Sequence, residues 1–521
     1  MVFRNKASQL SRYFLELTPD AAEAQLLKDG KGTACAIALS AAQDVIIKGL
    51  FAVATARIGQ GKVLHLSVIA TGGYGRGTLA PGSDIDLLFL LGAKASPEVN
   101  AVVEFLLYAL WDCKLKVGHA TREVDDCIRL AKTDNTILTS ILEARYICGE
   151  ESLFVELSRR FKAEIVATGA KKFVKEKLAE RDARHAKSGE SRYAVEPDLK
   201  DGKGGLRDLH TLFWIAKFIF NANSPEELAE RGAFTQEELH TFLKCEDFLW
   251  AVRCHLHFIS GRGEDRLSFD RQSEMAKRLR YKQHGGLRAV ARFMRHYFLI
   301  AKDVGDLTRI FCASLEEKHL KEVQGIARIF TRFLPRRAKT NLPIGFRLEN
   351  GRIGVVDANV FSSDPVNMLR IFWVAGESLL EIHPDALKLM RKSFRLIDDA
   401  LRHNQQANAI FLDILCKSTK PEVILRLMNE AGVLGRFIPE FGQIVAMMQF
   451  NMYHHYTVDE HLLRAVGVLS GIESGELAKE HPLTAELFPT LKARRVLYVA
   501  TLLHDIAKGR MEDHSIAGER I

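Results

Sequence analysis

Residues 71–90, TGGYGRGTLAPGSDIDLLFL, contain the pattern that decides the fold of the first part of the chain. Residues 84–91 read as an apolar β-strand, with Asp84 and Asp86 at its beginning. Side chains two residues apart on a strand point to the same face, so these carboxylates crowd together beside an apolar sheet. Because unpaired charge is costly there, we expect a cation between them.

The glycine-rich turn before this strand indicates that the cation is shared with a phosphate. Mg²⁺ prefers oxygen ligands and is typically shared with substrate phosphates. A missing Cβ at Gly72 and Gly73 lets phosphate oxygens approach backbone N–H groups. We therefore predict Mg²⁺-dependent nucleotidyl transfer with Asp84 and Asp86 as catalytic metal ligands. The residues expected at the nucleotide are Gly72, Gly73, Arg76 and Ser83.

Neither half of this motif is specific alone, because a glycine-rich loop is usually a turn and a lone Asp-x-Asp is usually a solvated strand end. Together they form a strand, Gly-Gly, ten residues and then Asp-Ile-Asp in an apolar strand, which resembles the polymerase-β-like nucleotidyltransferase superfamily. Neither a P-loop nor the dinucleotide-binding glycine spacing is present. That superfamily often has a third carboxylate, for which four candidates remain open: Asp125, Asp126, Glu196 and Asp198.

The composition is that of an ordinary soluble globular protein of about three domains. The 521 residues are 47% hydrophobic and 26% charged, and the net charge of +8 is too small to indicate a nucleic-acid binder. We see neither a signal-peptide pattern nor an uninterrupted apolar 18-mer. None of the eight cysteines forms a C-x-x-C pair, so the expected location is the reducing cytoplasm, with no membrane partner.

The expected organisation is an α/β core followed by helices. The core elements are a helix at 35–58, strands at 63–70, 84–91 and 114–120, and a helix at 103–113. From about 122 the pattern is almost wholly helical, with a cap at Ser224-Pro225 and a capping box at Thr235–Glu238. Residues 342–365 predict a short β-excursion and the best internal boundary, and helices resume at about 366.

A second group of polar residues lies near the C-terminus. His504 and Asp505 are adjacent in an apolar helix, and Thr457–Glu460 reads as a capping box that places His461 in the first turns of another helix. A single buried histidine is usually a hydrogen-bonded core residue. Two imidazoles with a carboxylate suit a divalent metal that activates water, and the set resembles the HD phosphohydrolase superfamily.

Further histidines have weaker roles. His514 is a possible further metal ligand. For His454 and His455, a position in a surface loop explains the residues at least as well as metal ligation does. His255 and His257 lie on opposite sides of a helix and are expected to be structural.

The loop DGKGGLRD (201–208) precedes a helix expected from about Leu206. Its N–H groups, with Lys203 and Arg207, fit a phosphate or carboxylate. An equal alternative is a tight loop in which Arg207 pairs with a local acid.

A nucleotidyltransferase core, a long helical region and an HD domain, in this order, resemble the bacterial PII uridylyltransferase/uridylyl-removing enzyme (GlnD) family. The stretches EPDLKDGKGGLRDLHTLFWIAK and GRGEDRLSFDRQ narrow the resemblance to this family. It implies transfer of UMP from UTP to a tyrosine of the PII signal protein, and hydrolysis of UMP-PII at an HD site holding Mn²⁺ or Mg²⁺. The implied ranges are 1–350 for the uridylyltransferase region (core about 40–130, helical part about 130–340) and 351–521 for the uridylyl-removing region (HD domain from about 455).

The resemblance also implies parts that this sequence lacks. The family continues into two ACT domains linked to glutamine sensing, whereas this sequence ends at Ile521, which the resemblance places inside the HD domain. The closing aspartate of the HD metal set would then be absent. We expect the transferase activity to remain, UMP removal to be poor, and glutamine to have no effect. The family also often has an acid where this chain has Thr78.

Three rival functions fit the sequence less well. A glutamine-synthetase adenylyltransferase shares the Gly-Gly…Asp-x-Asp core but has no HD site. A second-messenger synthetase/hydrolase has its HD domain first, opposite to the order here. A non-enzymatic PII-binding scaffold would be expected to have lost the carboxylates, and both are present.

Overall fold

A computed structural model describes residues 18–59, 64–92, 94–187, 192–284, 287–319, 342–349, 351–448, 456–508 and 514–521. The chain groups into two compact units. The first comprises residues 1–191, 197–280 and 303–308, and the second comprises 192–196, 281–302 and 309–521. The domain boundaries expected from the sequence stay predictions.

The first unit contains a four-stranded mixed sheet. Its strands are β1 (Leu66–Ala70), β2 (Ile85–Leu91), β3 (Val117–Glu123) and β4 (Arg145–Gly149). The order is β3-β2-β1-β4, with β1 antiparallel to both neighbours and β2 parallel to β3. Every residue of β1, and all but one of β2, is buried, as expected of central strands. The α/β nucleotidyltransferase core predicted from the sequence is confirmed.

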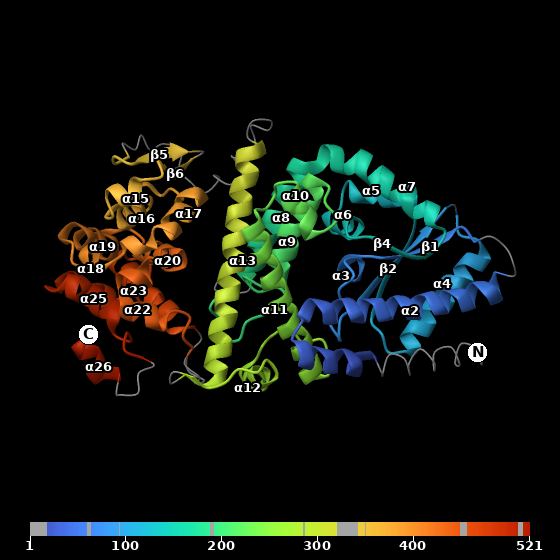
Figure 1. Cartoon of the computed structure of the whole chain (residues 1–521), viewed down its shortest axis with the longest axis horizontal. Coiled ribbons are helices and arrows are strands. Elements are labelled where there is room, and N and C mark those ends of the chain that lie inside the picture. The colour runs from blue at the N-terminus through green and yellow to red at the C-terminus, as the bar shows by residue number, and fades with distance from the viewer. Residues whose placement is uncertain are drawn as a thin grey trace. The chain divides into compact units, whose positions relative to one another are not determined.

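Helices surround the sheet and complete the first unit (Figure 1). Their bounds are α2 Gly32–Ile58, α3 Gly72–Gly75, α4 Pro97–Asp112, α5 Val124–Ala131, α6 Asn135–Leu142, α7 Glu151–Phe161, η1 Lys162–Val166, α8 Ala167–Lys187, α9 Leu206–Phe220, α10 Pro225–Glu230, α11 Gln236–Ser260 and α12 Phe269–Arg278. Helix α7 packs against β1, β2 and β4, and α4 packs against β3. The predicted cap at Ser224 and capping box at Thr235 are confirmed.

Helix α2 is long and apolar enough, by length and composition, to cross a membrane. Within the unit it packs against α4, α11 and β4. Its Asp44 accepts a hydrogen bond from the Tyr74 hydroxyl at 2.6 Å and forms an ion pair with Arg145 at 2.6 Å. These contacts make α2 a core helix of the nucleotidyltransferase unit.

The prediction that the chain is almost wholly helical after residue 122 is wrong at strand β4. The segment has only five residues, and it becomes a strand because it pairs with β1 at the edge of the sheet. Such pairing depends on a partner far away in the sequence, and local periodicity does not report it.

The described residues of the second unit are helical apart from one hairpin. Its elements are β5 Phe346–Glu349, β6 Arg352–Val355, α15 Val360–Ser363, α16 Asn367–Ser378, α17 Pro384–Lys392, η2 Phe394–Leu396, α18 Asp399–Arg402, α19 Gln405–Lys417, α20 Pro421–Ala431, α21 Leu434–Phe437, α22 Pro439–Ile444, α23 Val458–Glu473, α24 Pro482–Leu487, η3 Phe488–Thr490, α25 Arg494–Leu503 and α26 His514–Arg520. Helix α13 (Ala289–His319) groups mainly with this unit. The predicted β-excursion is confirmed as the antiparallel pair β5–β6. Helix α23 packs against α20 and α25 around a shared apolar core.

Two local predictions in this unit are wrong. Thr457 is the N-cap of α23, but its side chain makes no capping hydrogen bond, and the Glu460 carboxylate instead binds Arg426 and Arg464. Helix α25 ends at Leu503, so Asp505 follows the helix rather than lying inside it. The His504 side chain contacts the Thr501 carbonyl, which a continuing helix would offer to the N–H of residue 505.

Candidate functional site

The Asp86 carboxylate lies between two glycines. A Cβ on Gly72 would stand 2.9 Å from its Oδ2, and a Cβ on Gly118 would stand 2.4 Å from its Oδ1. Gly118 is the register partner of Asp86 across β2 and β3. Gly72 also has a φ of +56°, a conformation that favours glycine. The two glycines therefore leave the space in which this carboxylate sits.

The surroundings of Asp86 disfavour its negative charge. Burial raises the pKa of Asp86, the nearby Asp84 carboxylate raises it further, and Lys200 opposes both effects. A bound cation would relieve the repulsion between the two acids. Asp84 is exposed immediately before β2. The Ser83 hydroxyl accepts a hydrogen bond from the Ala80 N–H at 3.1 Å, within the turn that carries Asp84.

A cavity of about 360 Å³ opens beside Asp86. Gly72, Gly73 and Gly118 line it next to the carboxylate. Arg76 of the same glycine-rich turn lines it as well, together with residues from more distant parts of the chain: Glu143, Lys177, Glu180, Arg207 and Trp214. The structure thus brings four predicted site residues, Gly72, Gly73, Arg76 and Asp86, to one cavity, whereas Ser83 and Asp84 are not among its lining residues.

Three cations surround the indole ring of Trp214. The guanidinium carbons of Arg76 and Arg207 each lie 5.7 Å from the ring centroid, and the Lys177 Nζ lies 5.1 Å from it. Cations at such distances are attracted to the π-face of tryptophan. The ring therefore gathers positive charge within the walls of the cavity.

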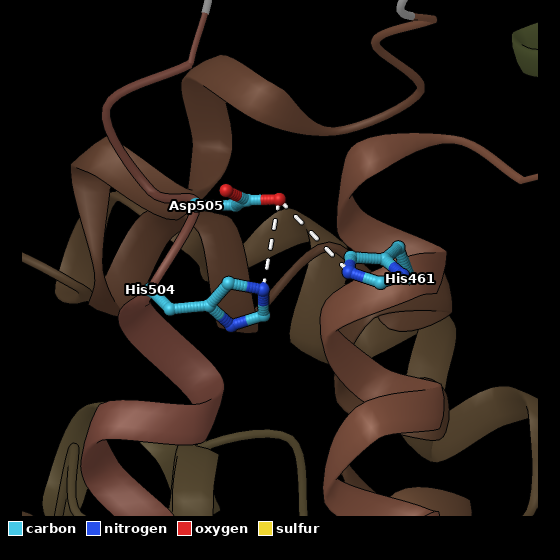
Figure 2. Close-up of side chains that lie close together, drawn as sticks. All are labelled: His461, His504 and Asp505. Atoms are coloured by element: carbon cyan, nitrogen blue, oxygen red, sulfur yellow. Dashed lines mark ion pairs between the residues drawn. The ribbon is translucent and has the colours of Figure 1, made fainter. Parts of the chain in front are cut away.

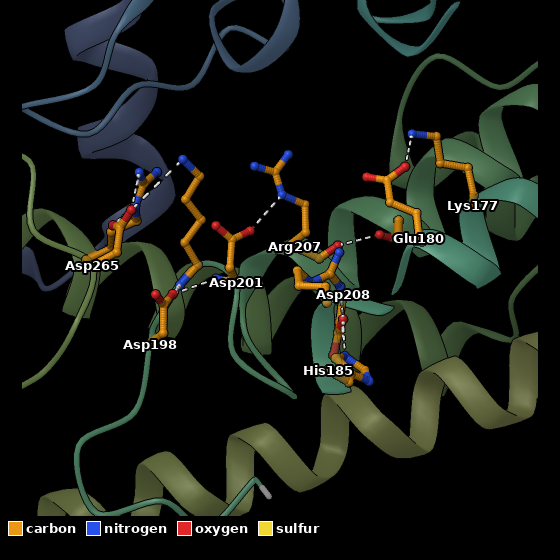
Figure 3. Close-up of polar contacts among 12 residues, drawn as sticks. Lys177, Glu180, His185, Asp198, Asp201, Arg207, Asp208 and Asp265 are labelled. Carbon is orange, nitrogen blue, oxygen red and sulfur yellow. Dashed lines mark hydrogen bonds and ion pairs between the residues drawn. The ribbon is translucent and has the colours of Figure 1, made fainter. Parts of the chain in front are cut away.

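Each of these cations also has a carboxylate partner. Arg76 pairs with Glu143 at 2.9 Å, Lys177 with Glu180 at 2.7 Å, and Arg207 with Asp201 at 3.1 Å. Figure 3 shows the Lys177–Glu180 and Arg207–Asp201 pairs. Arg207 thus pairs with a local acid, as one of the two alternatives predicted, and it also lines the cavity. Its role in binding a phosphate or carboxylate stays a prediction.

Helix α11 and the loop that follows it hold the turn that carries Asp84. The Gly82 N–H donates to Nδ1 of His257 at 3.1 Å, and the opposite ring nitrogen of His257 donates to Asp265 at 3.2 Å. A Cβ on Gly82 would stand 2.3 Å from the backbone nitrogen of Gly263, so the two loops meet backbone to backbone. From α11, His257 therefore anchors the turn that carries Asp84.

The second unit contains a group of potential metal ligands. Ligand atoms of His461, His504 and Asp505 all lie within 4.8 Å of one another (Figure 2). The Asp505 Oδ2 is 3.9 Å from Nε2 of His461 and 3.6 Å from Nε2 of His504. Two imidazoles with one carboxylate suit a divalent transition metal, so the residues fit the metal that the HD resemblance implies.

Neighbouring groups orient these ligands. Nδ1 of His504 lies 2.9 Å from the Thr501 carbonyl, to which it donates. Nε2 is then left with its lone pair for a metal, as is usual for a ligating histidine. The Lys508 ammonium lies 2.5 Å from Oδ2 of Asp505 and supplies the positive charge beside this carboxylate.

Three family models match successive parts of the chain. A nucleotidyltransferase domain matches residues 60–148, GlnD PII-uridylyltransferase matches 172–312, and the uridylyltransferase GlnD third domain matches 346–437. The chain belongs to the GlnD PII-uridylyltransferase family. Asp86 and its two glycines fall in the first of these matches, and Arg207, Trp214 and His257 fall in the second. The chain is therefore a nucleotidyltransferase of a family whose protein partner is PII and whose substrate is UTP.

The structure separates the candidates for a third carboxylate in this GlnD-family chain. Asp125 and Asp126 lie in the first turn of α5, beyond the far end of β3, which extends about 17 Å from the level of Asp86. Asp198 accepts hydrogen bonds from the N–H groups of residues 200 and 201 and so closes its own loop. Glu196 groups with the second unit.

The loop at 201–208 is anchored by a buried acid. Helix α9 begins at Leu206, as predicted, and Asp208 in its first turn accepts from the Gly204 N–H at 2.8 Å. Asp208 also binds His185 at 2.9 Å and Arg184. Burial alone would raise its pKa, but these hydrogen bonds and charges outweigh burial and lower it.

The remaining predicted histidines have different placements. His255 and His257 are both buried on α11. His514 is the first residue of α26, but its side chain lies outside the described residues, as do His454 and His455.

Sequence reasoning missed Glu143, Lys177 and Trp214. They lie at the end of α6, on α8 and on α9, away from the glycine-rich motif. The one available signal was Trp214 itself, a large aromatic residue seven positions after Arg207 in the family-specific stretch.

Proposed function

We propose that the chain transfers UMP from UTP to a tyrosine hydroxyl of PII and releases pyrophosphate at the cavity beside Asp86. One observation supports this most: a carboxylate held between two glycines and a cluster of three cations line the same cavity. A metal-bound triphosphate needs both an acidic anchor and positive charge.

The chain's own residues bind and orient the nucleotide in this proposal. Asp84 and Asp86 would hold Mg²⁺, which when bound neutralises phosphate charge. The backbone of Gly72 and Gly73 lets phosphate oxygens approach closely. Arg76, Lys177 and Arg207 offset the remaining negative charge, and their acid partners and Trp214 hold them in position before the substrate arrives.

The test replaces the two carboxylates with amides of the same shape. Asp84→Asn and Asp86→Asn should each abolish transfer of label from UTP to PII, because each removes a negatively charged ligand of Mg²⁺ without removing a packing group. The assay uses labelled UTP, ATP, GTP or CTP with Mg²⁺ and PII, and thermal unfolding of each variant checks the fold. Near wild-type transfer by either variant would contradict the assignment, and label from ATP alone would favour the adenylyltransferase alternative.

We further propose that His461, His504 and Asp505 hold a divalent metal, Mn²⁺ or Mg²⁺, and that this centre hydrolyses the phosphodiester of UMP-PII. The metal would lower the pKa of a bound water. Support comes from the convergence of two imidazoles and a carboxylate within 4.8 Å. Release of UMP from UMP-PII in the presence of Mn²⁺ is the measurement that tests it.

A further inference from the structure

The cavity beside Asp86 is called the nucleotide cavity here, and a second cavity of about 220 Å³ lies behind its wall. We propose that this second cavity binds a small organic monocarboxylate, which weakens the binding of UTP. The effect on UTP rests on the proposed transferase function, whereas the binding of the acid does not.

The chemistry of this second cavity fits an anion with an apolar body. Phe154, Leu157 and Phe161 of α7 form an apolar wall. Lys162 and Lys217 also line the cavity, and its described lining residues include no acid. Burying a carboxylate next to hydrocarbon is favourable only where cations compensate its charge, and two cations line this cavity.

The local backbone at this cavity is irregular. Lys162 begins η1, a π-helical turn that joins α7 to α8. Such turns are infrequent and often occur at functional sites. Lys162 is exposed and forms no ion pair with any residue that the structure describes, so its ammonium is available to a ligand.

The size of the cavity limits the ligand. A volume of about 220 Å³ lies below the roughly 300–1,000 Å³ of typical ligand pockets. An aromatic or short-chain monocarboxylate, such as benzoate, is of this order, whereas a nucleotide is too large.

One short segment separates the two cavities. Ile141 lines both of them, and Glu143, two residues later, lines the nucleotide cavity. A Cβ on Gly75 would stand only 2.2 Å from the Glu143 carbonyl oxygen, so the glycine-rich turn rests directly on this segment.

The buried Glu143 carboxylate connects the charges of the two cavities. Arg76, from the nucleotide cavity, lies 2.9 Å from its Oε2, and Lys217, from the second cavity, lies 3.8 Å from its Oε1. Oε1 has no hydrogen-bond partner among the described residues, so Lys217 is held only loosely. A carboxylate ligand that attracts Lys217 leaves Arg76 as the single cation on Glu143. Arg76 is then held more tightly by the acid and is less available to the phosphates of UTP.

The first experiment measures binding by isothermal titration of the full chain with benzoate, and with benzyl alcohol as the neutral analogue. We expect saturable binding of benzoate at least tenfold tighter than that of benzyl alcohol. Lys162→Met should weaken it at least tenfold, and Ser158→Phe, which fills the cavity from α7, should abolish it with thermal unfolding unchanged. Equal affinity for both compounds, or unchanged benzoate binding by Lys162→Met, would overturn the proposal.

The second experiment measures the coupling to UTP. Saturating benzoate should raise KM for UTP several-fold, and UTP should weaken benzoate binding by the same factor, because coupling is reciprocal. Lys217→Met should show a raised KM without benzoate and no response to it, whereas Lys162→Met and Ser158→Phe should keep the basal KM. Benzoate binding that leaves UTP affinity unchanged would refute the coupling. Since the titration does not use PII or turnover, it stands even if the proposed transferase function fails.

Discussion

At the scale of single residues, the site depends on two absent side chains as much as on the carboxylate that lies between them. Asp86 carries the charge, but Gly72 and Gly118 provide its space. Gly118 lies on an edge strand, where a side chain would ordinarily be tolerated or favoured. Its importance therefore comes from the neighbouring carboxylate and not from the strand.

Gly118→Ala tests this interpretation. The new Cβ would approach Oδ1 of Asp86 to 2.4 Å, so the carboxylate must move. We expect transfer to PII to fall by about 100-fold, since displacements of about 1 Å have such effects, with the fold retained. The matched control is Gly49→Ala on α2, where no atom lies within 4 Å of the new Cβ. It should leave transfer unchanged and raise the free energy of unfolding by about 0.5–1 kcal/mol. Equal activity of the two variants would mean that Asp86 tolerates displacement.

Trp214 offers a second test at this scale. Trp214→Leu removes the π-face on which Arg76, Lys177 and Arg207 converge. Each such contact contributes about 0.5–2 kcal/mol, so we expect KM for UTP to rise roughly tenfold or more. Trp214→Phe retains an aromatic face and should show a smaller increase, while kcat stays near that of the wild type in both. A fall in kcat with unchanged KM would show that the ring does not act through nucleotide binding.

The sequence predicted the residues at this site that belong to one continuous motif. Gly72, Gly73, Arg76 and Asp86 meet at the cavity because a strand and a tight turn fix their spacing. Trp214 and Lys177 were missed because they reach the cavity through the packing of α8 on α9, which local periodicity does not determine. The carboxylate partner Glu143 was missed because it reaches the cavity through the packing of α6 against α3 and α9.

At the scale of elements, the junction between α8 and α9 is held by one buried acid. Asp208 links the loop before α9 to α8 through Gly204, His185 and Arg184. This junction places Arg207 and Trp214 on α9 opposite Lys177 on α8. We infer that Asp208 positions the cation cluster without contacting the substrate.

Asp208→Asn should destabilise the chain by about 3–5 kcal/mol, because it leaves buried cations without their anion. The lowered pKa of Asp208 gives the sign of the pH dependence. Its contribution is fully present above the usual aspartate pKa and is lost as the pH falls through the lower folded-state value. Urea unfolding at several pH values should therefore show the largest difference between variant and wild type near neutrality and a shrinking difference in acid. A difference that grows on acidification would contradict this assignment.

The elements also show where prediction from sequence ends. Helix α9 and the hairpin β5–β6 were predicted because glycines, prolines and alternation mark them locally. Strand β4 was missed because only its pairing with β1 defines it. The end of α25 was misplaced because the His504 side chain, and not a breaker residue, takes the Thr501 carbonyl.

At the scale of the whole molecule, the two candidate sites belong to different compact units. The sequence predicted their order along the chain but not the composition of the units. Residues 192–196 group with the second unit because they contact distant segments. Arg192 pairs with Glu430 at 2.8 Å, and the Thr457 N–H donates to the Tyr193 carbonyl at 3.3 Å. Such contacts between segments more than 200 residues apart leave no local pattern in the sequence.

The two proposed activities oppose each other, and this gives a prediction for the molecule as a whole. With UTP, Mg²⁺, Mn²⁺ and PII, transfer and hydrolysis together should bring UMP-PII to a plateau set by the ratio of the two rates. His504→Ala removes one of three ligands of the proposed metal centre, so it should raise the plateau without changing the initial rate of transfer. Asp86→Asn should give no UMP-PII, yet should release UMP from PII modified beforehand as fast as the wild type does. The size of the plateau difference also measures the poor UMP removal expected from the sequence. If His504→Ala and the wild type reach the same plateau and release UMP at the same rate, His461, His504 and Asp505 do not form a uridylyl-removing site in this chain.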